Sequence, residues 1–276
     1  MTSGAVIVGG DDLYDKFGCF VVQGGYTDLV TMPPTKAVVC NEWAEYAGAE
    51  IDAETIVLDK REVTVQFAGT SEGRLHDLIL LLSTNGAIAW NFVEIGRQYT
   101  LRYTGVSAMQ ASMGLMLFSI KFVWNNPEEQ YTGGEEAQTI KMPPGKWKID
   151  GTVLDVYNAF VIGEITPAVL TAPVMQENFE QDCTLMTGVR LGGMLSESTR
   201  DLKMRLLMRA ESLSRLWMNY DALLHKLAEK QAHTLTRISD GQNFTFFYKT
   251  CTVNSFFASG KIWLDFTLKL CNYENF

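Results

Sequence analysis

The stretch GTVLDVYNAF, residues 151–160, decides how this chain is organised, because a similar stretch opens the sequence. Near the N-terminus, GDDLYDKFGCF at residues 10–20 carries a glycine, a leucine, an aromatic residue and a phenylalanine in the same order. Gly10 and Gly151 begin the two stretches, 141 residues apart. A second beginning past the middle of a 276-residue chain indicates an internal duplication.

Four further blocks repeat in the same order along the chain, with offsets that drift only between 139 and 148 residues. Ordered matches of this kind are the sign of a duplicated structural unit. The matched pairs are FVV at 20–22 with FVI at 160–162, REVTVQF at 61–67 with RDLKMRL at 200–206, YTLRY at 99–103 with FTFFY at 244–248, and FSIKF at 118–122 with FTLKL at 266–270.

The repeated blocks predict the same order of elements in each copy. Apolar residues alternate with polar ones in 61–67 and in 200–206, which is typical of half-buried strands. Leucines at helical spacing follow, from Leu75 to Leu82 in the first copy and from Leu213 to Leu227 in the second. Asn85 and Gly86 supply a stop for the first helix.

Each copy therefore predicts strands, one amphipathic helix and more strands, without an alternating βαβ rhythm. We expect a mainly β (α+β) chain of two antiparallel sandwich or barrel domains, each with one flanking helix. Between the copies, the segment from Asn125 to Lys146 is rich in proline, glycine and glutamate. The predicted organisation is a first domain over 1–125, a linker over 126–146 and a second domain over 147–276.

Composition narrows the class of protein. Hydrophobic residues make up 47% of the chain and charged residues 20%, which is typical of a globular protein with a sizeable core. No apolar run is long enough to span a membrane, since Lys121 interrupts the best candidate. The five cysteines are scattered and never form a CxxC pair, which favours reduced thiols and a chain made in a cytoplasm. The three histidines lack metal-ligand spacing, so no metal site is expected.

The charge is unevenly spread between the copies. Of a formal net charge of −9, residues 1–140 hold 8 Lys/Arg and 18 Asp/Glu, whereas the remainder hold 15 and 14. An acidic chain repels nucleic acid rather than binding it tightly. The asymmetry favours two halves in different surroundings or facing each other, with a solvated acidic face as the simpler interpretation.

One catalytic motif has to be weighed. GTSEG at 69–73 matches the G-x-S-x-G nucleophile elbow and lies between a predicted strand and a predicted helix. A hydrolase would use Ser71 with His225 or His233. The alternative is that the glycines form a turn and that Ser71 caps the helix, which the absence of a parallel βαβ pattern favours. We therefore expect no catalytic residue.

Two charged patterns have simple structural interpretations. Asp11, Asp12 and Asp15 lack the glycine and the distal glutamate of a calcium loop, which favours an ordinary turn. Lys203 and Arg205 share one face of a predicted strand, and Arg209 follows. We expect this basic face to be turned toward solvent or a partner.

The opening VGGDDLYDKFGCFVVQGGYTDL resembles the first strands of distal tail proteins of long-tailed bacteriophages. REVTVQF, the helix after it and GRQYTLRY at 96–103 continue the similarity in order. The resemblance covers most of residues 5–125 and, more faintly, 147–272. It implies tail-tube-like units, assembled into a ring around a channel through which DNA only passes, with no enzymatic activity and no cofactor.

The resemblance also implies a role and partners. Such proteins are adapters of the virion that join the tail tube to the tip or baseplate, so the implied partners are the tail tube protein, the tape-measure protein and the tip or receptor-binding proteins. Related hub proteins carry two tube-like units per chain, which leaves open a trimer with pseudo-six-fold symmetry and a hexamer. A tube or hub component of a contractile injection apparatus is the alternative assembly.

Two long segments, Pro34 to Asp59 and Val174 to Ser198, lie where tube-like folds extend a loop or hairpin toward neighbours. Their large apolar side chains are the predicted subunit-interface residues. The alternative is that these side chains fold back onto their own domain. The candidates are Trp43, Tyr46, Ile51, Ile56, Phe179, Leu185 and Met186.

Overall fold

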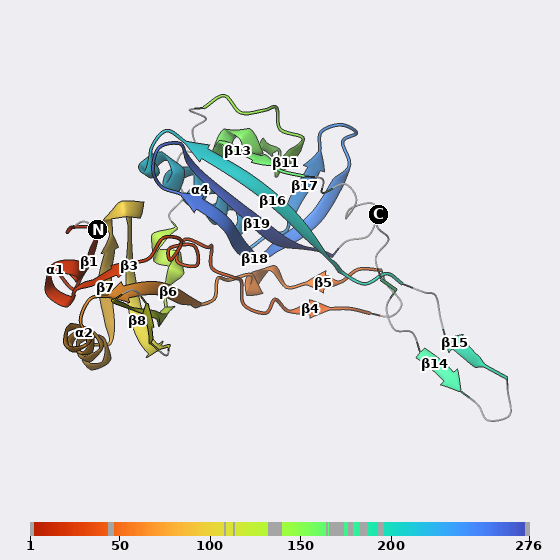
Figure 1. Cartoon of the computed structure of the whole chain (residues 1–276). Helices are drawn as coiled ribbons and strands as arrows, with labels where there is room; N and C mark the ends of the chain where they lie inside the picture. Colours follow the sequence, from red (N-terminus) through yellow and green to blue (C-terminus); the bar gives the residue numbers. More distant parts are fainter. Residues whose placement is uncertain are drawn as a thin grey trace.

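The computed structural model describes residues 3–43, 47–107, 109–112, 114–131, 140–163, 165, 174–175, 179–182, 187–192 and 196–273. These residues form a mainly β protein in which every strand pairing is antiparallel. Two large sheets, one in each half of the chain, dominate the molecule (Figure 1). The expected fold class is confirmed at this level.

The first sheet has the strand order β2-β1-β7-β8-β10-β6-β3, and β9 pairs with β10. Helix α2 (Glu72–Thr84) covers its inner face with Leu75, Leu78 and Leu82 buried. The strands are β1 (Val6–Val8), β2 (Asp11–Asp12), β3 (Cys19–Val21), β6 (Arg61–Gly69), β7 (Ala87–Phe92), β8 (Arg97–Val106), β9 (Gln110–Ser112) and β10 (Leu115–Trp124). The short helices of this half are α1 (Leu13–Phe17), η1 (Ala53–Thr55), η2 (Val93–Ile95) and η3 (Pro127–Gln130).

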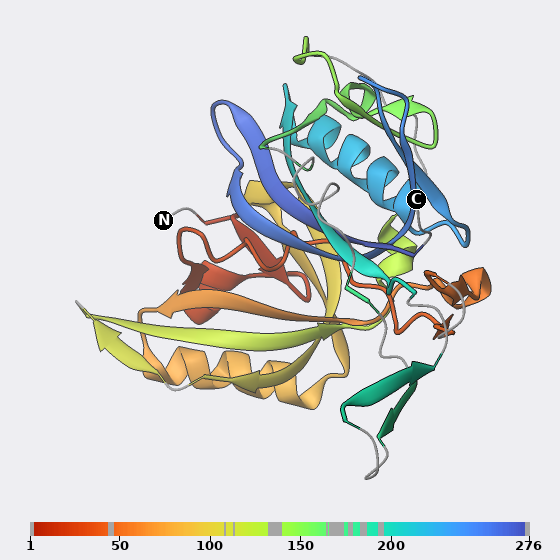
Figure 2. The same ribbon diagram turned by 90° about the vertical axis from the view of Figure 1, so that its right-hand side faces the viewer.

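The second sheet has the order β12-β11-β17-β18-β19-β16-β13, which is the order of the first sheet strand for strand. Helix α4 (Leu213–Leu227) lies across its inner face (Figure 2). The strands are β11 (Trp147–Ile149), β12 (Thr152–Val153), β13 (Ala159–Val161), β16 (Arg200–Ala210), β17 (His233–Arg237), β18 (Asn243–Phe257) and β19 (Ile262–Asn272). The short helix η4 (Leu154–Tyr157) follows β12.

The two stretches that opened the sequence comparison form the same substructure. Gly10 (φ 94°) and Gly151 (φ 80°) are the second residues of the two-residue turns in the β1–β2 and β11–β12 hairpins. Positive φ angles at such positions give the turn a twist that matches the twist of the two strands. A short helix follows in both halves. It ends at Gly18 (φ 63°) in the first half and at Asn158 (φ 54°) in the second. Helix α1 has one residue more than η4, which accounts for the offset falling from 141 to 140.

The predicted strands and helices are confirmed, and the alternation matches burial. Val63, Val65 and Phe67 point into the core of the first half, as do Leu202, Met204 and Leu206 in the second. The strands of the two sheets lie on either side of the predicted linker. Within that linker Tyr131 is buried against Trp124, so its start packs on the first half.

Smaller hairpins project from each half at corresponding places. The segment between β3 and β6 holds the two-stranded pair β4 (Cys40–Asn41) and β5 (Glu50–Ile51). The segment between β13 and β16 holds β14 (Phe179–Asp182) and β15 (Val189–Gly192). Figure 1 shows β4–β5 beneath the second sheet, whereas β14–β15 extends away from both sheets.

Candidate interaction surfaces and the junction between the halves

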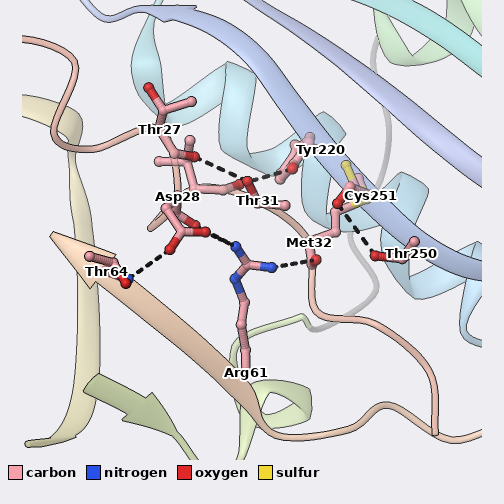
Figure 3. Close-up of polar contacts among 10 residues, drawn as sticks. Thr27, Asp28, Thr31, Met32, Arg61, Thr64, Tyr220, Thr250 and Cys251 are labelled. Carbon is pink, nitrogen blue, oxygen red and sulfur yellow. Dashed lines mark hydrogen bonds and ion pairs between the residues drawn. The ribbon is translucent and has the colours of Figure 1, made fainter. Parts of the chain in front are cut away.

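A segment of the first half, residues 28–35, crosses over to contact the second half, and a buried arginine fixes the start of this crossing segment. The Arg61 guanidinium donates to the carboxylate of Asp28 at 2.5 Å, to the Asp28 carbonyl at 2.7 Å and to the Met32 carbonyl at 3.3 Å. The other Asp28 oxygen accepts from the Thr64 backbone N–H at 2.7 Å (Figure 3). Strand β6, which carries Arg61 and Thr64, therefore fixes the position of the crossing segment at Asp28.

Two buried tyrosines of the second half receive this segment. The Tyr220 hydroxyl donates to the Val30 carbonyl at 2.9 Å, and the Tyr248 hydroxyl donates to the Pro33 carbonyl at 2.9 Å. The Thr35 backbone N–H donates to the Lys249 carbonyl at 3.0 Å. Because the Val30 and Pro33 carbonyls are buried, the two hydroxyl donors satisfy groups that would otherwise be costly to bury.

Helix α4 makes a second contact with the first half, beside η2. The Trp217 indole N–H donates to the Ile95 carbonyl at 2.6 Å. Arg97 pairs with Asp221 through two hydrogen bonds of 2.9 and 2.5 Å, and its guanidinium lies 4.3 Å from the centre of the Trp217 ring. Burial raises the pKa of the Asp221 carboxyl, and Arg97 opposes that rise. The halves are thus joined by paired charges as well as apolar packing.

The segment that carries β4–β5 continues along the edge of the second sheet. Ile56 packs in an apolar cluster with Phe247, Cys271 and Tyr273, all from the second half. The Ala49 N–H donates to the Tyr273 carbonyl at 3.0 Å. This first-half segment is therefore bound to the second half of its own chain.

These contacts decide where the predicted interface residues lie. Ile56 is 1% exposed and Ile51 is half-buried beside the same cluster, so both pack within the chain. Ile56 is therefore not a subunit-interface residue, because the second half of its own chain already covers it. Trp43 is 54% exposed and stays available to a partner. Phe179 begins β14, where its backbone pairs with that of Gly192.

The remaining interface candidates, Tyr46, Leu185 and Met186, lie outside the described residues. The described residues that flank these candidates contact one another. Glu197 pairs with Met175 in an isolated bridge, and the Gly48 N–H donates to the Glu197 carbonyl at 2.8 Å. The Thr199 hydroxyl also donates to Glu42 at 2.8 Å. The bases of the two projecting hairpins therefore touch each other.

Ser71 lacks the geometry of a nucleophile elbow. It immediately precedes α2 with an extended backbone (φ −150°, ψ 130°), whereas the elbow places its serine on a sharp, strained turn. Its side chain makes no cap hydrogen bond, although Ser212 at the same place before α4 accepts from the Arg215 N–H. His225 is exposed on α4, and His233 is buried beside Asp150 at 2.7 Å. The strand–helix–strand surroundings are antiparallel throughout the described sheet.

Asp12 caps a helix, where the sequence predicts an ordinary turn. Its carboxylate accepts from the backbone N–H groups of Tyr14 and Asp15 and caps α1. Within the described residues no cluster of histidine, cysteine, aspartate or glutamate side chains has the arrangement of a metal site. The four described cysteines are free thiols, and burial raises the pKa of Cys19 and Cys251 to about 12.

The basic face of β16 lies on the outer surface of the second sheet, as the alternation predicts. Lys203, Arg205 and Arg209 are all exposed. Arg205 pairs with Asp265 on the neighbouring β19, and Lys249 and Lys269 both pair with Asp201. In the described part of the chain Lys203 and Arg209 have no such carboxylate. This surface is therefore basic, with Arg205, Lys249 and Lys269 paired to carboxylates and Lys203 and Arg209 left exposed.

The structure brings together residues that the sequence reasoning missed, notably Arg61, Arg97 and Asp221. The sequence contains a signal that the two arginines are buried. Arg61 and Arg97 occupy the same alternation as the buried side chains of β6 and β8, so the alternation places each on the inward face of its strand. A charged residue at an inward position requires a buried partner.

Comparison with protein-family models finds no match for this chain, and comparison with curated proteins finds none either. Among the described helices, none has the length and apolar character needed to cross a membrane. The case for a function therefore rests on the duplicated architecture and the surfaces it leaves uncovered.

Proposed function

We propose that this chain is a structural protein of a bacteriophage tail tip, a distal tail or hub protein that forms a ring joining the tail tube to the tip or baseplate. The observation that carries the proposal is the identical strand order of the two sheets within one chain. Two equivalent units in series are what a ring subunit with internal pseudo-symmetry needs. The resemblance of the opening residues to distal tail proteins supports the same role.

The junction between the halves supports an assembly. The first half extends a hairpin-bearing segment under the second half, and the second half extends the corresponding β14–β15 hairpin into open space (Figure 1). Antiparallel sheets that end in an edge strand, here β3 and β13, are also suited to pairing or close packing with a neighbour. Both features fit a subunit that meets further copies.

The outer sheet surfaces suit a channel through which DNA passes. The outward side chains of the first sheet include the uncharged Thr64, Gln66, Thr100 and Thr104 and the charged Glu62, Arg102 and Lys121. The basic residues of the second sheet are mostly paired, as described above. Neutral polar side chains and paired charges leave these surfaces fewer free cations for holding the phosphate backbone than a sheet built to bind nucleic acid carries.

The proposal is tested by the mass of the purified chain in solution, measured by sedimentation velocity at micromolar concentration. The expected result is a species of three or six chains, with the tail tube protein and the tip proteins as its partners in the virion. A chain that stays monomeric at all concentrations tested would contradict the ring.

A further inference from the structure

The internal repeat lets each position at the junction be compared with its counterpart in the other half. Ser71 and Ser212 both precede the main helix, which places His76 opposite Trp217 and Leu80 opposite Asp221 in the two helices. The strands align through a shared bulge. Thr104 of β8 and Lys249 of β18 are both skipped in the pairing with the next strand, so Tyr103 corresponds to Tyr248.

In the second half, these positions are covered by the first half. Trp217, Tyr220 and Tyr248 are buried, and each donates a hydrogen bond to a first-half carbonyl. The Asp221 side chain is only 16% exposed because Arg97 lies against it. Cys251 is buried near the same crossing segment, beside Thr31.

In the first half, the counterparts are open. Leu80 is 53% exposed, and His76 is exposed on the same helix. Ile79, Tyr103 and Val106, the counterparts of Tyr220, Tyr248 and Cys251, are each partly exposed. We call these five residues the receiving surface. It has the same place on the fold as the covered surface of the second half, and the described residues of its own chain leave it partly exposed.

The second half carries the counterpart of the segment that covers Tyr220 and Tyr248, and the described residues of that counterpart are exposed. Met175 forms an isolated bridge with Glu197, as Thr35 does with Leu58, so Val174 and Met175 correspond to Pro34 and Thr35. Pro34 and Thr35 are partly buried against the second half, whereas Val174 is 77% exposed and Met175 is 49% exposed. We call Val174 and Met175, with the β14–β15 hairpin beyond them, the projecting segment.

We propose that the projecting segment of one copy docks on the receiving surface of the next, repeating between chains the junction that joins the halves within a chain. The partner is a second copy of this chain, because the intrachain junction already shows how the two kinds of surface fit together. This proposal rests on the ring of the proposed function and assigns its contacts.

The repeated junction has a direction. The receiving surface belongs to the first half and the projecting segment to the second, so each copy offers one of each. A contact between two different surfaces is heterologous, and such contacts build rings when the rotation closes. A two-fold dimer would instead need one surface that matches itself.

Two variants block the two surfaces separately. Leu80→Glu places a charge on the receiving surface, and Val174→Glu places one on the projecting segment. Both side chains are exposed in the single chain, so the thermal unfolding midpoint should be unchanged. Each variant alone should lose assembly, with self-association at least about tenfold weaker because a buried charge without a partner is costly.

Mixing the variants tests the direction of the contact. A Leu80→Glu chain retains its projecting segment, and a Val174→Glu chain retains its receiving surface. An equimolar mixture can form one intact junction and no second one, so sedimentation velocity should show a dimer and no ring. Two variants that stay separate on mixing, while each has lost assembly alone, would overturn the head-to-tail contact.

Ile238→Glu is the matched control. Ile238 is 42% exposed on the turn after β17, and its counterpart Val93 stays 50% exposed beside the junction that the chain already forms. A repeated junction should therefore leave Ile238 uncovered, and this variant should assemble like the unaltered chain.

The outcomes separate this proposal from the proposed function. If the unaltered chain forms rings and both blocking variants form them equally well, the assigned contacts are wrong and the ring stands. If the unaltered chain is monomeric, both proposals are overturned. Loss of assembly in the Ile238→Glu control would also overturn the assignment, because the effect would not be specific to the two surfaces.

Discussion

The indole N–H of Trp217 lies 2.6 Å from the carbonyl oxygen of Ile95, and this hydrogen bond joins the main helix of the second half to a loop of the first. Both residues are buried, so neither group can exchange its partner for water. The contact belongs to a junction that includes Arg97 and Asp221 and that holds the two repeated units in one fixed arrangement.

Replacing Trp217 by phenylalanine should therefore destabilise the chain. The change leaves the Ile95 carbonyl buried without a donor and removes the ring face on which Arg97 lies, for an expected loss of about 2 kcal/mol. Urea unfolding followed by far-UV circular dichroism measures it. Trp43→Phe is the control, because Trp43 is exposed and its replacement should change the unfolding free energy by less than about 0.5 kcal/mol.

The Arg97–Asp221 pair should show strong non-additivity. Asp221→Leu alone leaves a buried guanidinium without its carboxylate and should cost about 3–5 kcal/mol. Adding Arg97→Gln removes the uncompensated charge, and the resulting pair, Gln and Leu, is the one found at the corresponding positions Gln242 and Leu80. The double variant should recover most of the loss in urea unfolding. Additive losses would show that the two residues do not act as a pair.

A glycine comparison tests the turn that the two halves share. Gly18 has φ 63°, and a Cβ there would lie 2.5 Å from the Thr70 hydroxyl, so Gly18→Ala should cost about 1–2 kcal/mol or more. Gly73→Ala lies within α2 with open space around it and should stabilise by up to about 1 kcal/mol. Thermal unfolding of the two variants should give shifts of opposite sign. A stabilised Gly18→Ala would contradict the left-handed turn.

Asp265 predicts a pH dependence of stability. Hydrogen bonds from Arg205 hold the pKa of this carboxyl below its ordinary value of 3.8, although burial opposes them. A lowered pKa in the folded state gives stability that is complete above the ordinary value and is lost as the pH falls through the folded value. Asp265→Asn should therefore cost about 1 kcal/mol at neutral pH, and this difference should shrink below about pH 4.

The control for that series is Asp77→Asn. Asp77 is exposed on α2 and, within the described residues, takes part in no ion pair. The unfolding free energy of the Asp77→Asn variant should match that of the unaltered chain both at neutral pH and below about pH 4. A difference at Asp265 that persists unchanged at low pH would mean that its charge does not supply the stabilisation.

Local sequence patterns predicted the elements well because burial repeats at short range. The alternation in residues 61–67 and 200–206 and the leucine spacing from 213 to 227 matched β6, β16 and α4. The extent of β18 was underestimated: it runs from Asn243 to Phe257, and its two register shifts interrupt the simple alternation after Tyr248. A bulge changes which residues point inward, so periodicity alone stops at it.

The junction could not be predicted in the same way. Ile56 was assigned to a subunit interface because its segment is long and apolar, yet it is buried against Phe247 and Cys271, which lie far away in the sequence. Which surface covers such a segment depends on how one unit is rotated against the other, and no local pattern encodes that rotation. The inward positions of Arg61 and Arg97 indicate buried partners without naming them.

Electron micrographs of the purified chain test the central claim most directly. The account predicts ring-shaped particles with a central channel and three- or six-fold symmetry, in which each chain contributes two equivalent sheets to the wall. Compact particles of a single chain, without a channel and without that symmetry, would contradict it.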